Sequence, residues 1–451
     1  MGDEAWRSRV HGLIVRGPAD ALLFPSEHGW SLPSVELESF SDDDLRPARR
    51  AFEELLGTPV AVLRYAARHL DREQRLLEVV DVLEPLDTDW KPPVGAEWMD
   101  RSSLSSLRLG REEHREILLR ALDASASGVV PPERAPWARE GWLVEAAEWI
   151  EESLSALGRP PTGRLEQIRA WCLSSLLRVP TAAGAVFFKA TAGSPLFVDE
   201  GTVMRGLAEL FPESVPAPLA VNSPRRWMLL ADLGSELGWD APLEVREEVL
   251  RVFARMQIES AGRADDLLAL GCIDRRLDML AAEARDLLAD DSSLAGLDDE
   301  EAAMARAFGS KLDALCTALA EAGVPNTLLH GDLHLSNVAR LDGRYVFFDW
   351  TDASVGHPLF DLIDVFREEN EAVRDRLRDV YLSAWVGFEP LDRLLDIWNL
   401  AQPLAFMHHA VSYRHIAANV ERESGQELEW ALPYFLRKVL AAETNAGQSS
   451  L

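Results

Sequence analysis

The stretch TLLHGDLHLSNVARLDGRYVFFDW runs from Thr327 to Trp350 and places a group of polar residues between two apolar segments. The apolar segments, Thr327–Leu329 and Tyr345–Phe348, predict buried strands. The polar residues that follow the first of them are His330, Gly331, Asp332, His334, Ser336 and Asn337. Polar groups cost free energy when they lose water, so a core segment rarely carries this many without a use. The stretch indicates a functional site, with a plain polar loop between core strands as the simpler interpretation.

The dipeptide Asp342-Gly343 predicts how the second half of this stretch folds, because it is a favoured pair for a two-residue hairpin turn. Counting back from that turn places Asn337 opposite Phe348, one residue before Asp349. Directly opposed residues in an antiparallel pair lie about 5 Å apart. We therefore expect an amide oxygen and a carboxylate side by side at one mouth of the hairpin. Two such oxygen donors suit Mg²⁺.

The pattern His330-Gly-Asp332-x-His334-x-x-Asn337, followed by a strand and Asp349, resembles a known segment. It is the catalytic and metal-binding segment of aminoglycoside phosphotransferases and of the wider choline-kinase and fructosamine-kinase group. Protein kinases use a related layout. The resemblance implies that Asp332 is the base that accepts the proton of a hydroxyl group. It also implies that Asn337 and Asp349 hold Mg²⁺, and that His330 and His334 shape the loop.

The resemblance covers roughly residues 164–440 and implies an ATP site upstream of the loop. Lys189 closes the strand-like segment AVFFKAT, where the family has its ATP-phosphate lysine, and Glu200 heads the next helix and is expected to pair with it. The segment WMLLADL resembles the hinge that holds adenine, which implies binding from Ala231 to Leu233.

Two further positions follow from the same resemblance. No G-x-G-x-x-G pattern precedes Lys189, so Trp171–Ser175 is expected to take the place of the phosphate loop, with Ser174 and Ser175 as candidate donors. Asp361, in GHPLFDLIDV, matches a family element that buttresses the catalytic loop.

The distance along the chain from Asp349 to Leu359 favours a small substrate. It leaves room only for a short loop and none for the regulated activation segment of a protein kinase. We therefore expect a small hydroxylated acceptor, bound by the C-terminal helices. An aminoglycoside, an amino sugar, another sugar, a choline-like amine and a nucleoside all remain open.

Composition excludes some partners. The net charge is −29, from 75 acidic and 46 basic residues, which disfavours nucleic acid and anionic lipid and tilts weakly toward a cationic partner. No apolar run is long enough to span a bilayer, and the start of the sequence lacks a secretory pattern. The three cysteines, Cys172, Cys272 and Cys316, are far apart, which favours reduced thiols and a cytoplasmic location.

The predicted fold class is α+β, with a bilobal, protein-kinase-like fold preceded by a small α/β domain. We expect residues 1–123 to form the small domain and residues 124–163 to form a linker and an amphipathic helix. Residues 164–240 are expected to form the nucleotide-binding lobe. Residues 241–451 are expected to form the catalytic, largely helical lobe.

The first domain faintly resembles a degenerate Nudix domain. Aligned on Gly57, the segment ARRAFEELLGTPV keeps Arg50 and Glu54 of the Nudix box but has Ala51 and Leu55 where the family has metal-binding glutamates. An ordinary capped amphipathic helix, with a capping box at Ser41–Asp44, explains the segment as well. We expect a binding or structural domain, which could limit access to the kinase cleft.

The sequence therefore favours an ATP-dependent O-phosphotransferase that uses Mg²⁺. One alternative is a nucleotide-binding pseudokinase or sensor without transfer activity. Another is a Nudix-type hydrolase that acts through the first domain.

Overall fold

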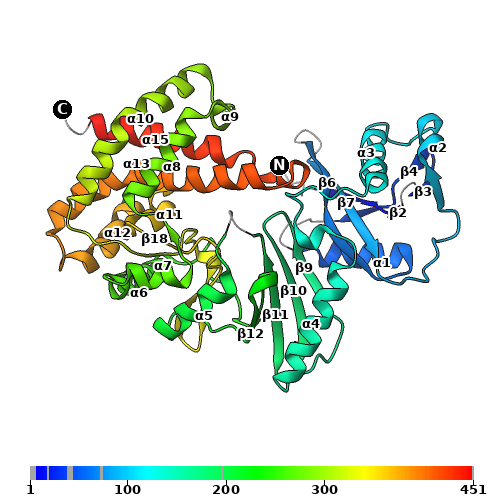
Figure 1. Cartoon of the computed structure of the whole chain (residues 1–451), viewed down its shortest axis with the longest axis horizontal. Helices are drawn as coiled ribbons and strands as arrows, with labels where there is room; N and C mark the ends of the chain where they lie inside the picture. The colour runs from blue at the N-terminus through cyan, green and yellow to red at the C-terminus, as the bar shows by residue number, and fades with distance from the viewer. Residues whose placement is uncertain (1–6, 18–19, 38–43, 72–74, 194–196, 449–451) are drawn as a thin grey trace, which may run out of the picture. The chain divides into compact units, whose positions relative to one another are not determined.

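The computed structural model describes residues 7–17, 20–37, 44–71, 75–193 and 197–448 (Figure 1). The chain divides into two compact units. The first unit consists of Met1–Ala192 and Val420–Gln426, and the second of Gly193–Asn419 and Glu427–Leu451. None of the helices in the described ranges combines the length and the apolarity needed to cross a membrane. The four segments expected from the sequence remain a prediction about domain boundaries.

The first unit begins with a mixed four-stranded sheet in the order β5-β1-β7-β6. Strands β1 and β7 run parallel, and the other neighbours run antiparallel. Its strands are β1 (Arg7–Leu13), β5 (Ser34–Leu37), β6 (Val60–Asp71) and β7 (Leu76–Pro85). Helix α1 (Arg46–Leu56) buries Phe52 and ends at Gly57, whose φ of 69° is left-handed. The helix and its stop are as predicted, while most of the expected capping box lies outside the described residues.

A smaller antiparallel sheet lies in the same unit. It contains β2 (Val15–Arg16), β3 (Asp20–Ser26), β4 (Gly29–Ser31) and β8 (Glu97–Asp100), and it is followed by α2 (Arg101–Ser106) and α3 (His114–Ser127). Strands β2 and β3 pair antiparallel, and Pro18 and Ala19 between them lie outside the described residues. The expected linker from Ala124 starts later than predicted, because α3 continues to Ser127 and ends at Gly128 with φ 63°.

Three antiparallel strands complete the first unit: β9 (Glu166–Ala170), β10 (Ser174–Thr181) and β11 (Gly184–Thr191). A tight turn joins β10 and β11, because Thr181 pairs with Gly184. Helix α4 (Trp142–Ala156) lies beside these strands (Figure 1), and its Trp142 and Trp149 rings lie 6.0 and 5.8 Å from the Phe188 ring. Trp142 is buried and Trp149 is partly buried, so both pack against the sheet.

The first domain and strand β9 are joined by hydrogen bonds within this unit. The Gln167 side chain accepts from the Val62 N–H (2.9 Å) and donates to the Val62 carbonyl (2.7 Å). The Leu45 N–H donates to the Ile168 carbonyl at 2.7 Å. Gln167 is 2% exposed, and a buried peptide group needs hydrogen-bond partners. The Gln167 amide supplies the partners that a neighbouring strand would otherwise give to Val62. The N-terminal domain therefore supports the sheet that carries Lys189.

The second unit is mostly helical, as predicted, around large apolar clusters. Helices α13 and α15 pack along each other (Figure 1). Its strands are β12 (Ala220–Asn222), β13 (Trp227–Ala231), β14 (Ile273–Asp274), β15 (Thr327–Leu329), β16 (Val338–Leu341), β17 (Arg344–Phe347) and β18 (Ser354–Gly356). Its longer helices are α5 (Glu200–Leu210), α6 (Leu243–Ser260), α8 (Leu277–Ala289), α10 (Asp299–Ala320), α12 (Glu371–Leu382), α13 (Leu391–Asn419) and α15 (Ala431–Gln448).

Candidate active site

The hairpin of β16 and β17 has the register that the sequence predicted. Asp342 and Gly343 form its two-residue turn with φ values of 49° and 81°, as a type I′ turn requires. The Phe348 N–H donates to the Asn337 carbonyl at 3.1 Å, which places Asn337 opposite Phe348. Asp349 follows with φ 64°, a left-handed conformation in which aspartate is more common than most residues.

The loop that precedes the hairpin is fixed by Asp361. One carboxylate oxygen of Asp361 accepts from the His330 N–H (2.9 Å), and the other accepts from the Gly331 N–H (2.8 Å). The Gln257 side chain donates to the same carboxylate at 3.1 Å. Burial raises the pKa of Asp361 to about 7, while these donors favour the ionised form. Asp361 thus supplies the hydrogen-bond acceptors for the backbone N–H groups of His330 and Gly331.

Gly331 lies where the loop comes closest to the chain that follows the hairpin. Its φ is 84°, and a side chain there would overlap the carbonyl oxygen of Asp352. Only glycine fits both the backbone angle and the available space. The loop can therefore present Asp332 without moving away from its support.

Asp332 is exposed at the end of this loop, with 52% of its side chain accessible. The neighbouring protein opposes its ionisation, but the hydrogen bond and the charge of His334 outweigh that effect and lower the pKa of Asp332 to about 2. The His334 Nε2 lies 3.6 Å from the Asp332 carboxylate. In turn, Asp332 raises the pKa of His334 against the effect of burial. At neutral pH the carboxylate is ionised and able to accept a proton.

Asn337 and Asp349 lie at the base of the hairpin. The Asn337 amide nitrogen donates to the Asp332 carbonyl (3.0 Å) and lies 3.1 Å from the His334 Nε2, which leaves the amide oxygen for another partner. One Asp349 oxygen accepts from the Thr351 hydroxyl at 3.1 Å. The register thus places an amide oxygen and a carboxylate at neighbouring positions.

His330 has a structural place under the loop. Its ring is fully buried, its Nε2 lies 2.9 Å from the Phe348 carbonyl, and its centroid lies 4.6 Å from the Trp350 ring. Burial lowers the pKa of His330 to about 4, so the ring is neutral at physiological pH. This contact ties the loop to the strand end that carries Asp349.

The residues expected at the nucleotide lie on other elements. Lys189 lies in β11 of the first unit and is 9% exposed. Glu200 begins α5 in the second unit, and its carboxylate accepts from the Trp350 N–H at 3.1 Å. Ala231 ends β13, and Leu233 follows it. Lys189 and Glu200 belong to different units, and their pairing remains a prediction.

The two serines of the expected phosphate loop differ in accessibility. The connection from β9 to β10 is the hairpin Trp171–Leu173. Ser175 is fully buried and donates to the Arg169 carbonyl at 3.3 Å. The Ser174 hydroxyl accepts from the Trp171 indole at 2.8 Å. Ser174 is thus the better placed of the two to meet a ligand, because the Ser175 side chain is enclosed by protein.

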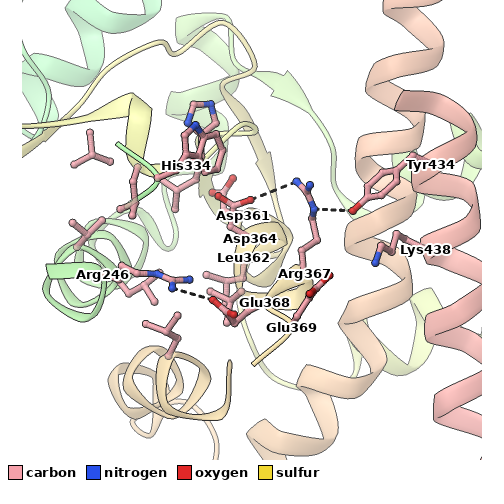
Figure 2. A pocket seen from close by; sticks show the side chains of 18 residues that line it. Arg246, His334, Asp361, Leu362, Asp364, Arg367, Glu368, Glu369, Tyr434 and Lys438 are labelled. Carbon is pink, nitrogen blue, oxygen red and sulfur yellow. Dashed lines mark hydrogen bonds and ion pairs between the residues drawn. The ribbon is translucent and has the colours of Figure 1, made fainter. Parts of the chain in front are cut away.

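A cavity of about 650 Å³ adjoins the catalytic loop within the second unit (Figure 2). His334 lies at its edge, with the exposed Trp239 stacked on the histidine at a centroid distance of 4.8 Å. Further round, the lining carries the charged or polar side chains Arg246, Asp364, Arg367, Glu368, Glu369, Tyr434 and Lys438. The sequence had not marked most of these residues, because they come from separate helices and match no local motif.

Sequence comparison gives a family for the part of the chain that holds this site. Residues 189–394 match the model of the phosphotransferase enzyme family, APH. That segment, somewhat less than half of the chain, is similar to this family. It contains Lys189, Asp332, Asn337 and Asp349, so the resemblance drawn from the sequence is confirmed for this part of the chain.

Solved structures resemble the phosphotransferase fold over a wider range. An ethanolamine kinase of Plasmodium vivax is 9% identical, aligns over 76% of this chain and 96% of its own, and has a TM-score of 0.51. A macrolide 2'-phosphotransferase of Brachybacterium faecium is 19% identical over 63% of this chain and 98% of its own, with a TM-score of 0.44. A choline kinase of Streptococcus pneumoniae is 15% identical over 66% and 99%, with a TM-score of 0.46. No curated protein is similar enough to count as a match.

The likeness to the ethanolamine kinase bears on the fold alone. It shows that the α+β fold predicted for the phosphotransferase part is the fold of a small-molecule kinase. The Nudix resemblance of the first domain remains a prediction.

Proposed function

We propose that the phosphotransferase transfers the terminal phosphate of ATP to a hydroxyl group of a small molecule, with Asp332 as the base. The observation that carries this proposal is the placement of Asp332. Its carboxylate is exposed and ionised, it lies on a loop fixed by Asp361, and the loop adjoins a cavity large enough for a small substrate.

Asn337 and Asp349 are the residues that would hold Mg²⁺. Within the described ranges, no group of three or more His, Cys, Asp or Glu side chains could hold a metal ion. This fits a Mg²⁺ site of few protein ligands, because that ion usually keeps water and phosphate oxygens around it. When bound, Mg²⁺ neutralises charge on the phosphates.

The protein residues then have distinct tasks. Asp332 orients the acceptor hydroxyl and takes its proton as the oxygen attacks phosphorus. Lys189 is proposed to contact the ATP phosphates, and Ala231 to Leu233 are proposed to hold adenine. His330 and Asp361 keep the loop in place, as their hydrogen bonds support.

The variant Asp332→Asn tests the proposed base, because the amide keeps the size of the side chain but cannot accept the proton. We expect transfer to fall by roughly 10²–10⁴-fold, with ATP affinity and unfolding temperature unchanged. Rates with a panel of hydroxylated acceptors, calorimetry with MgATP and thermal unfolding measure the three quantities.

Asp342→Asn is the matched control, since it makes the same change at the other end of the same hairpin. Asp342 lies in the turn at φ 49°, where asparagine fits equally well. A wild-type transfer rate in Asp332→Asn would remove this residue from the mechanism. Loss of ATP binding or of folding would instead assign it a structural task.

For the N-terminal domain we propose a structural task. Glu53 of α1 lies 3.2 Å from the buried Arg49 and 3.5 Å from Arg164, so it neutralises cations within the first unit. With Ala51 and Leu55 at two expected metal positions, Glu54 is left as the carboxylate retained from the Nudix box. One carboxylate is a poor site for the metal that hydrolysis would need.

A further inference from the structure

The cavity beside the catalytic loop has a different charge balance from the whole chain. The chain carries 75 acidic and 46 basic residues. The cavity is lined by the acids Asp364, Glu368 and Glu369 and by the bases Arg246, Arg367 and Lys438. Asp361 also reaches the lining, but both of its oxygens accept backbone N–H groups of the loop. The cavity lining is therefore closer to neutral than the whole chain.

Two of these charges cancel each other directly. Arg246 and Glu368 form an ion pair with an N–O distance of 2.9 Å, and both side chains are mostly buried. Figure 2 shows this pair on one side of the cavity, apart from the tyrosine on α15. Neither partner keeps much charge to offer a ligand.

Two cations converge on the opposite side, at Tyr434. Arg367 donates from Nε to the Tyr434 hydroxyl at 2.9 Å, and its guanidinium lies 5.2 Å from the ring centroid. The Lys438 ammonium lies 5.5 Å from the same ring. In the described part of the chain, the carboxylate paired with Arg367 is that of Asp364, at a distance of 3.7 Å.

Lys438 is the more informative of the two cations. Among the residues that the structure describes, no carboxylate lies within the ion-pair distance of its ammonium group, whereas Lys311 on α10 pairs with Glu443. Lys438 is half-buried in the cavity wall, where a charge costs more free energy than at an open surface. The face formed by Arg367, Tyr434 and Lys438 thus carries excess positive charge and is called the cationic face below.

We infer that the acceptor carries an anionic group, such as a carboxylate, in addition to the hydroxyl group that receives phosphate. The anionic group is bound by Lys438 and Arg367 on the cationic face, while the hydroxyl lies toward Asp332. This inference rests on the proposed function and reverses the weak tilt toward a cationic acceptor. The exposed Glu369 leaves room for an amine in the same molecule, so a hydroxylated amino acid or a sugar acid fits.

Two matched pairs of acceptors test this inference: D-glucose against D-glucuronate, and ethanolamine against L-serine. L-Serine is ethanolamine with an added carboxylate, and D-glucuronate has a carboxylate in place of the C6 hydroxymethyl group of glucose. We expect the acidic member to have the higher kcat/KM with the wild-type protein. Lys438→Met, which keeps the length of the stem, should lower that value by roughly 10–100-fold through KM, and Lys438→Arg should retain most of it.

Lys311→Met is the matched control, because it removes a lysine that is paired outside the cavity. It should leave both preferences unchanged. If the uncharged or amine member is the better acceptor, or if Lys438→Met leaves the preference for the acid intact, the inference is overturned while the kinase function stands.

A binding measurement separates this inference from the proposed function. Without ATP, D-glucuronate and L-serine should raise the unfolding temperature of the wild-type protein and of Lys311→Met, but not that of Lys438→Met. A shift of this kind without any transfer supports the cationic face and contradicts the proposed activity toward these scaffolds. No shift with either acid and no preference in transfer overturn the inference.

Discussion

Single residues of the catalytic loop are constrained by space as well as by charge. At Gly331 and at Gly343 the backbone φ values are nearly equal, at 84° and 81°, yet the surroundings differ. A side chain at Gly331 would overlap the Asp352 carbonyl, whereas nothing lies within 4 Å of the same position at Gly343. The two glycines therefore separate the effect of backbone strain from the effect of crowding.

We predict that Gly331→Ala lowers the free energy of unfolding by roughly 2–4 kcal/mol and abolishes transfer, because strain and overlap add and displace Asp332. Gly343→Ala should cost only about 1 kcal/mol, from strain alone, and keep its activity. Urea unfolding and transfer rates measure both effects. Equal losses in the two variants would show that the space around Gly331 is not the constraint.

At the scale of elements, the side chain of Gln167 fastens β9 to β6. Its amide pairs with both the N–H and the carbonyl of Val62, near the place where the register of β6 shifts along β7. Strand β6 lies at the edge of its sheet, where backbone groups have no strand partner on the outer side, and the glutamine serves those of Val62. One side chain thus carries out the pairing that a strand usually supplies.

We predict that Gln167→Ala destabilises the first unit by roughly 2–4 kcal/mol, since it leaves two buried backbone groups without partners. Gln167→Met should cost nearly as much, because it restores volume but no hydrogen bonds. Chemical denaturation and hydrogen exchange at the Val62 amide measure the loss. Wild-type stability in the methionine variant would mean that packing, not hydrogen bonding, holds the two strands together.

The sequence predicted elements where local rules decide them. The turn at Asp342-Gly343 fixes its own register, so the position of Asn337 opposite Phe348 could be counted from the turn. Helix α1 followed from its apolar periodicity, and it ends at the glycine Gly57. Motifs and residue spacing therefore suffice to predict the hairpin and its loop.

The cavity could not be predicted by the same means. Arg246 lies on α6, Arg367 on α11 (Ile363–Arg367) and Lys438 on α15, and only the packing of those helices brings them to one cavity. No spacing rule links such distant positions. For the same reason, net charge does not describe the lining, because pairing decides which charges remain available.

At the scale of the whole molecule, buried histidines make stability depend on pH. Burial is the first cause that lowers the pKa of His11 to about 3, of His357 to about 3 and of His409 to about 4. Each binds a proton in the unfolded chain near its ordinary pKa of 6.5 but not in the folded one. The stability due to these rings is complete above pH 6.5 and is lost as pH falls toward 3–4. Asp352 and Asp361, whose pKa values burial raises to about 7, act in the opposite direction.

We predict that the histidines prevail and that the free energy of unfolding falls between pH 6.5 and 4.5. His11→Phe should flatten this dependence, because His11 alone accounts for about 2–3 kcal/mol of the change over that range. Urea unfolding at a series of pH values measures the slope. A slope that His11→Phe leaves unchanged would mean that this ring is protonated in the folded protein.

The segment Val420–Gln426 belongs to the first unit, although the residues on both sides of it belong to the second. Its Glu421 accepts two hydrogen bonds from Arg134, at 3.1 and 2.6 Å, and the two residues are 287 positions apart in the chain. Both side chains are mostly buried, at 14% and 11% exposure, so each needs the other.

This pairing sets an order of events during synthesis. A ribosome adds roughly 5–20 residues per second, so Glu421 emerges about 15–60 s after Arg134. During that time Arg134 has to remain hydrated or pair with another anion. The surface that later binds the segment is accessible to chaperones and to other nascent chains. The N-terminal unit is synthesised first, but its folding is completed only when the late segment Val420–Gln426 has been made.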